Sequence, residues 1–108
     1  MDLAVECIGI ASQRTRRGSA VLMNQVMRSA ISIPSNIAEG AGRDSTRDYL
    51  RHLGIANGSL KELETQLILA ERVGFERRER VEDALAVADE SGRLLTGLRQ
   101  SLRRRSRK

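Results

Sequence analysis

The chain has 108 residues, of which 40% are hydrophobic and 31% charged, and it contains no Trp, one Tyr, one Phe and one Pro. This length supports a single domain with an aliphatic core, and the balance of residues favours a small all-α protein. The lone cysteine, Cys7, excludes an internal disulfide, and no apolar run approaches the length of a membrane span. The early acidic residues Asp2 and Glu6 do not fit a secretory signal, so we expect a cytoplasmic protein without a membrane partner.

Basic residues gather at the C-terminal end of the sequence. The formal net charge is +5, yet residues 1–98 carry 13 basic and 14 acidic side chains. Residues 99–108 carry six basic side chains and no acidic one: Arg99, Arg103, Arg104, Arg105, Arg107 and Lys108. We therefore expect a bundle domain over residues 1–98 and a basic tail over residues 99–108 that binds the phosphates of nucleic acid. A solvated, frayed chain end is the alternative.

The first half of the sequence predicts two helices. A short helix over residues 2–11 is followed by a polar loop over residues 12–18. The second helix, over about residues 19–42, has a stripe of apolar residues that predicts its buried face: Met23, Met27, Ala30, Pro34, Ile37 and Ala41. Pro34 predicts a kink, with a complete break as the alternative, and the glycines at positions 40 and 42 predict a left-handed end.

The second half predicts two longer helices. Ser45 fits a capping pattern with Asp48, and a helix over about residues 46–73 then buries one stripe: Leu53, Ala56, Leu60, Leu63, Leu67 and Ala70. Within it, Gly54 and Gly58 predict close approach of another helix, and Gly74 is its predicted stop. A last helix over about residues 77–102 buries a second stripe: Val81, Ala84, Ala88, Ser91, Leu95, Leu98 and Leu102. The whole pattern predicts an up-down four-helix bundle with a short first helix and a Pro-kinked second helix.

The sequence offers no set of catalytic or metal-ligating residues. His52 is the only histidine, and we interpret it as structural or solvated, with Asp48 one turn earlier as a surface partner. No Glu-x-x-His motif occurs, so we expect no metal site. No nucleophile with its base can be assembled either, so we expect no catalytic residue, and we expect no cofactor. We therefore expect that the protein is not an enzyme.

Two further patterns bear on nucleic acid. Gly40-x-Gly42 followed by Arg43 could hold a phosphate on backbone amides, although it lacks a preceding strand and a Lys-Ser/Thr signature. Tyr49 and Phe75 are too few to form a base-stacking platform, which disfavours sequence-specific reading of single strands.

Two runs of residues resemble a known family. The first is Ser32-Ile33-Pro34-Ser35-Asn36-Ile37-Ala38-Glu39-Gly40, followed by Gly42-Arg43, and the second is Leu50-Arg51-His52-Leu53-Gly54-Ile55-Ala56-Asn57-Gly58-Ser59-Leu60-Lys61-Glu62-Leu63-Glu64-Thr65-Gln66-Leu67. In this order they resemble the four-helix bundle proteins encoded in 23S rRNA intervening sequences. That family is similar to the accessory variability determinant proteins of diversity-generating retroelements, and the resemblance covers about residues 20–75.

The resemblance implies a pentameric homo-oligomer that binds RNA or DNA and a reverse transcriptase. It also marks six polar residues for testing: Ser35, Asn36, Glu39, Arg43, Glu62 and Glu64. We expect Asn36 and Glu39 to satisfy backbone and arginine groups near the kink, with Arg43 or Arg51 as partners. Because family members carry a longer first helix, this helix is expected to be shortened here or the native start to lie upstream of Met1.

The function expected from all of this is that of a non-enzymatic, self-associating helical bundle. It would bind nucleic acid through basic surfaces, as an accessory to a reverse transcriptase. A structural or protein-partner adaptor that does not bind nucleic acid is the alternative.

Overall fold

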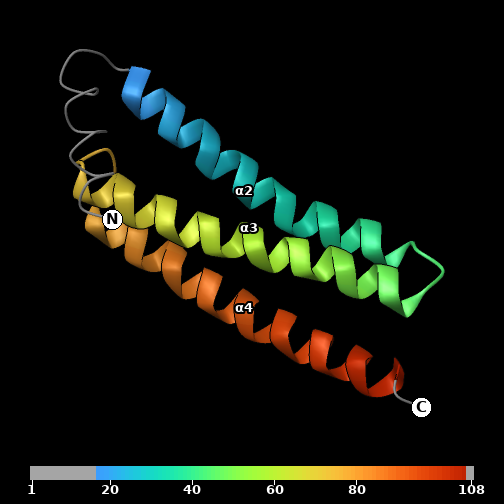
Figure 1. The fold of residues 1–108 in the computed structure, drawn as a ribbon. Coiled ribbons are helices and arrows are strands. Elements are labelled where there is room, and N and C mark those ends of the chain that lie inside the picture. Colours follow the sequence, from blue (N-terminus) through green and yellow to red (C-terminus); the bar gives the residue numbers. More distant parts are fainter. Residues whose placement is uncertain (1–16, 107–108) are drawn as a thin grey trace.

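The computed structural model describes residues 17–106, and this part of the chain consists of three α-helices without a strand (Figure 1). They are α2 (Arg17–Ala41), α3 (Thr46–Arg72) and α4 (Arg78–Ser106). The label α1 is left for the helix predicted over residues 2–11, which lies outside the described residues. Successive helices run in opposite directions, and α3 lies between α2 and α4 and packs against both. The all-α prediction is confirmed.

The ends of the helices follow from local backbone chemistry. The Ser45 Oγ accepts a hydrogen bond from the Asp48 N–H at 3.0 Å, so the predicted N-cap of α3 is confirmed. Gly74 has a φ of +79° just after α3, which confirms it as the predicted stop. Within residues 17–106 no other residue has a positive φ, so the predicted left-handed end of α2 at Gly40 and Gly42 is wrong. Instead, the Gly42 N–H continues the helical pattern by donating to the carbonyl of residue 38 at 3.1 Å.

The central helix supplies most of the core. The stripes predicted for α3 and α4 are confirmed, with these members buried: Leu53, Ala56, Leu60, Leu67, Ala70, Val81, Ala88, Leu95 and Leu102. One cluster joins the first half of α3 to the second half of α4, and Tyr49 packs against it. A second cluster joins the start of α2 to the end of α3, and Phe75 packs against that one. Both aromatic side chains therefore have structural positions.

The stripe predicted for α2 is wrong as a description of its buried face. Met27 and Pro34 are exposed, whereas Leu22 and Ser29 are buried. The pattern failed because α2 meets α3 partly through small and polar residues, which an apolar count overlooks. Three members of the stripe, Ala30, Pro34 and Ile37, line an apolar groove of about 420 Å³ between α2 and α4. The rest of its lining comes from all three helices: Ile33, Leu60, Leu63, Ser91, Leu94, Leu95 and Leu98. Helix α2 is continuous through Pro34, which excludes the complete break.

Gly40 sets how closely α2 approaches α3. It is buried, and a Cβ atom at this position would lie 2.8 Å from the His52 Cβ and 3.3 Å from the backbone carbonyl oxygen of Tyr49. The first of these distances is shorter than Cβ contacts in proteins, and the backbone of α3 cannot move aside without shifting the helix. The glycine is therefore required by packing between helices.

We expect Gly40→Ala to lower the free energy of unfolding by about 1–3 kcal/mol, because the added methyl group overpacks the interface. Gly58→Ala is the matched control, since nothing lies within 4 Å of a Cβ at this helical position. That substitution should raise stability by up to about 1 kcal/mol through helix propensity. Urea unfolding of both variants measures the difference, and equal effects of the two substitutions would contradict the packing role of Gly40.

Candidate nucleic-acid interface

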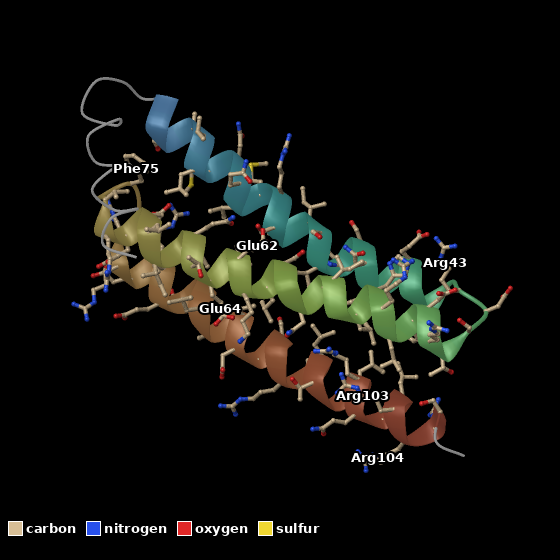
Figure 2. All side chains as sticks on the ribbon, viewed as in Figure 1. Arg43, Glu62, Glu64, Phe75, Arg103 and Arg104 are labelled. Atoms are coloured by element: carbon tan, nitrogen blue, oxygen red, sulfur yellow. The ribbon has the colours of Figure 1, made fainter. Side chains whose placement is uncertain are left out.

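The basic residues near the C-terminus are carried by a helix. Residues 99–106, which the sequence analysis assigned to a basic tail, form the last two turns of α4. Leu102 lies among them, is 6% exposed and belongs to the same core cluster as Leu53, so these turns are anchored to α3. Arg103 and Arg104 are exposed, as is the arginine that follows them (Figure 2). Arg107 and Lys108 lie outside the described residues.

Charge is separated along α4. Residues 78–90 carry five acidic and two basic side chains: Glu79, Glu82, Asp83, Asp89, Glu90, Arg78 and Arg80. Residues 91–106 carry five basic side chains and no acidic one: Arg93, Arg99, Arg103, Arg104 and Arg105. Acidic residues near the start of a helix and basic residues near its end also stabilise the helix, because they interact favourably with its dipole. The second half of α4 is thus an arginine-rich helical surface.

The part of α3 that faces this arginine-rich segment has no acidic residue. Residues 49–61 contain neither Asp nor Glu. The two segments face each other, since the Arg99 side chain lies beside Gly54 and the Leu60 side chain lies beside Gly92. No carboxylate from either facing segment is therefore available to neutralise Arg99.

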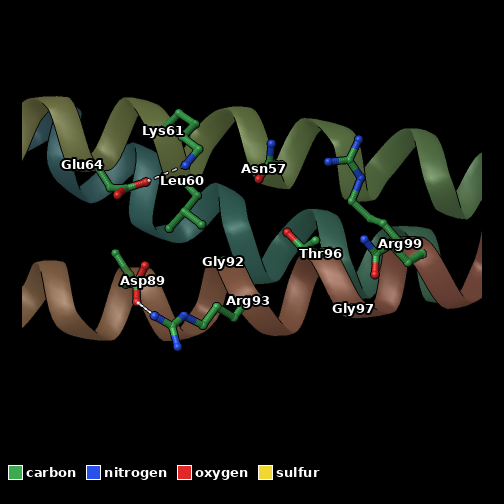
Figure 3. Close-up of a pocket in the computed structure, with 12 residues that line it drawn as sticks. Asn57, Leu60, Lys61, Glu64, Asp89, Gly92, Arg93, Thr96, Gly97 and Arg99 are labelled. Carbon is green, nitrogen blue, oxygen red and sulfur yellow. Dashed lines mark ion pairs between the residues drawn. The ribbon is translucent and has the colours of Figure 1, made fainter.

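A groove of about 520 Å³ runs between α3 and α4 along this contact (Figure 3). Arg99 reaches across from α4, and its Nη2 lies 4.0 Å from the position that a Cβ on Gly54 would take. The Arg99 Nε is buried without a hydrogen-bond partner within the described part of the chain. Close helix approach at Gly54 and Gly58 is not observed, because a side chain covers the first and nothing lies within 4 Å of the second. That prediction is wrong.

The acidic residues of the groove lie at its other end and form ion pairs. The Lys61 Nζ lies 3.5 Å from a carboxylate oxygen of Glu64, and the Arg93 Nη2 lies 3.1 Å from one of Asp89 (Figure 3). Between these pairs and Arg99, the lining is neutral and polar: Asn57, Thr96 and Gln100. The charge of Arg99 is consequently the one without an ionic partner among the groove residues described.

The structure does not bring the six polar family residues into one site. Glu39 forms an exposed ion pair with Arg43, which lies just after α2 (Figure 2). Glu62 is exposed on α3, and Glu64 pairs with a lysine of its own helix. Ser35 is exposed on α2. The expected pairing of Glu39 with Arg43 is confirmed, although it stays on the surface.

Asn36 instead belongs to a polar network between α2 and α3. Its Nδ2 donates to the Ser32 carbonyl at 2.9 Å and to the Ser32 Oγ at 3.0 Å. The same Oγ lies 2.7 Å from the Ser59 Oγ. The Asn36 Oδ1 lies 3.2 Å from the Nδ1 of His52, a side chain that is 7% exposed. The structural interpretation of His52 is confirmed, but its partner is on α2, so Asp48 was the wrong expectation.

The partners of His52 define its tautomer. An amide oxygen only accepts hydrogen bonds, so the Nδ1 that faces Asn36 carries a proton. On the other side of the ring, the Arg51 Nη2 lies 3.3 Å from the His52 Nε2, and a guanidinium only donates. The Nε2 therefore accepts from Arg51. Sequence reasoning missed Ser59 in this network, because the sequence does not show which face of α3 is turned toward α2.

The phosphate cradle considered at Gly40-x-Gly42 is not formed. The Gly42 N–H and the Arg43 N–H both donate to backbone carbonyls at 3.1 Å, and Gly40 is packed against α3. Within residues 17–106, no three His, Cys, Asp or Glu side chains are grouped so that they could hold a metal ion. In the same part of the chain, no helix is both long enough and apolar enough to cross a membrane.

The described helices define the class: an antiparallel all-helical protein with an arginine-rich end. The chain belongs to the 23S rRNA-intervening sequence protein family, whose model matches residues 1–97. This confirms the resemblance to the 23S rRNA-intervening sequence proteins. A comparison with curated proteins gives no match. The family match ends before Arg99, so the arginines of the last two turns of α4 lie beyond it.

Removal of the Asn36 amide is expected to destabilise the α2–α3 interface. Asn36→Ala leaves the buried His52 Nδ1–H without its acceptor, which should lower the free energy of unfolding by about 1–3 kcal/mol. Ser35→Ala, at the neighbouring exposed position, should change it by no more than about 0.5 kcal/mol. Urea unfolding separates the two cases, and a neutral Asn36→Ala would show that the network contributes nothing to stability.

Proposed function

We propose that this protein is a non-enzymatic, self-associating helical bundle that binds RNA or DNA through the arginine-rich end of α4. The observation that carries the proposal is the acid-free segment of α4 over residues 91–106, in which Arg99 lies against an acid-free segment of α3 and the last three arginines are exposed. Basic residues without nearby carboxylates attract phosphate backbones and release their counterions. The proposal includes a reverse transcriptase as the protein partner, for which this chain would be an accessory protein. This partner is implied by the similarity to accessory variability determinant proteins.

The exposed arginines can be tested without damage to the core. Deletion of residues 99–108 would also remove the buried Leu102, so charge substitutions are the better design. The triple variant Arg103→Gln, Arg104→Gln and Arg105→Gln should weaken binding to a labelled RNA of mixed sequence. It should also reduce the slope of log K against log salt by about 2, because each lost phosphate contact contributes about 0.7 on a single strand. Fluorescence anisotropy at several salt concentrations measures both quantities.

The matched control removes the same number of charges from the other end of the molecule. Arg77, Arg78 and Arg80 are exposed, and two of them pair with Glu76 and Glu82. Their joint replacement by Gln should leave affinity and slope close to those of the unsubstituted chain. If both triple variants bind alike, the proposed surface is refuted. Failure of the unsubstituted chain to bind both this RNA and a labelled DNA of the same sequence refutes nucleic-acid binding altogether.

The proposed four-helix bundle places the predicted first helix in the apolar groove between α2 and α4. Leu94, which lines this groove, is 72% exposed. The apolar residues predicted for the first helix have the character to cover it: Leu3, Val5, Ile8 and Ile10. A helix of ten residues spans about 15 Å, which is shorter than α3 at about 40 Å. The remaining apolar surface supports self-association.

A second apolar surface supports self-association independently. Val21, Met27 and Ile31 lie on α2, and each is about 60% exposed. They line a shallow depression together with Asn24, Gln25 and Arg28. Exposed apolar patches of this kind are typical of protein interfaces. The number of subunits, five, rests on the family resemblance alone.

Light scattering on the full chain tests assembly. We expect a mass of about five chains at both low and high salt, because an apolar interface is not screened. Ile31→Glu should lower the mass, whereas Val87→Glu, at an equally exposed apolar position on α4, should not. A monomer in every condition would refute self-association.

A protein-partner adaptor without nucleic-acid binding is the second candidate, and the same α2 surface favours it. Under that function, Ile31→Glu would abolish partner binding, and the triple arginine variant would have no effect.

A further inference from the structure

We propose that the groove between α3 and α4 is a phosphodiester-binding site in which the Arg99 guanidinium binds the nonbridging oxygens of a nucleic-acid backbone. This inference rests on the proposed function and deepens it. It assigns the central contact to Arg99, a half-buried arginine in the groove. The exposed arginines at the end of α4 supply only additional contacts.

The first argument is the unsatisfied state of Arg99. Its Nε is buried without a hydrogen-bond partner, and no carboxylate within the described residues pairs with the side chain. A buried donor that lacks an acceptor is unfavourable, more so when it is charged. Arg99 lines the groove, so an anion that enters it would offset the positive charge of this side chain.

The second argument is the shape of the guanidinium site. Because Gly54 has no side chain, the Arg99 side chain can extend from α4 across the groove to α3 (Figure 3). Gly97 lines the groove from α4 and has nothing within 4 Å of the position that a Cβ would take, so no side chain fills the groove there. Arg99 thereby lines the groove, and a planar guanidinium is suited to binding a phosphate through two N–H groups.

The third argument is the chemistry of the rest of the lining. Asn57, Thr96 and Gln100 provide neutral hydrogen-bond donors beside Arg99, and the acidic residues of the groove are already paired with Lys61 and Arg93. A phosphodiester has one negative charge and several acceptor oxygens, so one cation with neutral donors around it matches its needs.

The fourth argument is continuity, which favours a polymer. Arg103 follows Arg99 by one helical turn, about 6 Å along α4. It is exposed and is followed by two further exposed arginines. A strand that binds at Arg99 can thus continue along basic side chains. Since Tyr49 and Phe75 are packed against the core clusters, no aromatic side chain of the described residues is free to stack on bases, and binding should be independent of sequence.

The test uses the full chain and a labelled single-stranded RNA, with affinity measured by fluorescence anisotropy. Arg99→Gln should weaken binding by tenfold to a hundredfold, the range of a hydrogen bond to a charged group. Arg78→Gln removes the same charge from the exposed start of α4 and should change the affinity less than twofold. Equal binding by these two variants, with the unsubstituted chain binding RNA, would overturn the groove site and leave the proposed function standing. An unsubstituted chain that binds neither this RNA nor a DNA strand of the same sequence would overturn the proposed function instead.

A second variant blocks the site without removal of Arg99. Gly54→Glu places a carboxylate next to the guanidinium and improves helix propensity, so the fold should be kept while RNA affinity falls at least tenfold. Thr65→Glu adds the same charge to an exposed position three turns further along α3 and is the matched control. Equal RNA affinity of the two variants would overturn the site.

Inorganic phosphate tests the site independently of RNA. In nitrogen-edited NMR spectra, the Arg99 Nε–H signal is identified by its loss in Arg99→Gln. It should shift on addition of phosphate at concentrations that leave the Arg78 signal unmoved. No selective shift would overturn the proposal. Displacement of RNA by an acidic peptide at lower concentration than by unlabelled RNA would overturn it as well, because the groove would then prefer carboxylates.

Discussion

The close approach of α2 to α3 at Gly40 is the constraint on which the rest of the structure depends. With no side chain at this position, the two helices come close enough for Asn36 to reach His52 and for the hydroxyls of Ser32 and Ser59 to meet. These polar contacts have defined partners and distances, so they fix the register of the two helices as well as their separation. The central helix is then held with its opposite side free for α4.

The sequence predicted the helices well because their signals are local. The N-cap at Ser45, the stop at Gly74 and the apolar stripes of α3 and α4 each follow from residues within a few turns of one another. The buried face of α2 was not predictable in this way. Its contacts use serine, asparagine and glycine, and only the identity of the neighbouring helix shows that these residues are internal.

The candidate site was predictable in composition but not in geometry. The basic residues from Arg99 onward are visible in the sequence, and they predict a preference for anions. Their extended helical presentation depends on the burial of Leu102 against α3. The position of Arg99 over Gly54 depends on the register of two helices that are 45 residues apart at this point, which no local pattern encodes. The glycines of α3 had instead suggested a helix contact.

The charge separation along α4 gives this helix an electrical polarity with a direction. The molecule is elongated, 56 × 22 × 21 Å, and α4 has an acidic half and a basic half. In the field of a polyanion such a molecule experiences a torque, which turns the basic end of α4 toward the polyanion before contact. In a ring of subunits around an axis parallel to the helices, these polarities add, so that one rim is basic throughout. In a two-fold pair with opposed helices they cancel. If the chain assembles as proposed, the symmetry of the assembly therefore decides whether it presents a preferred face to a polyanion.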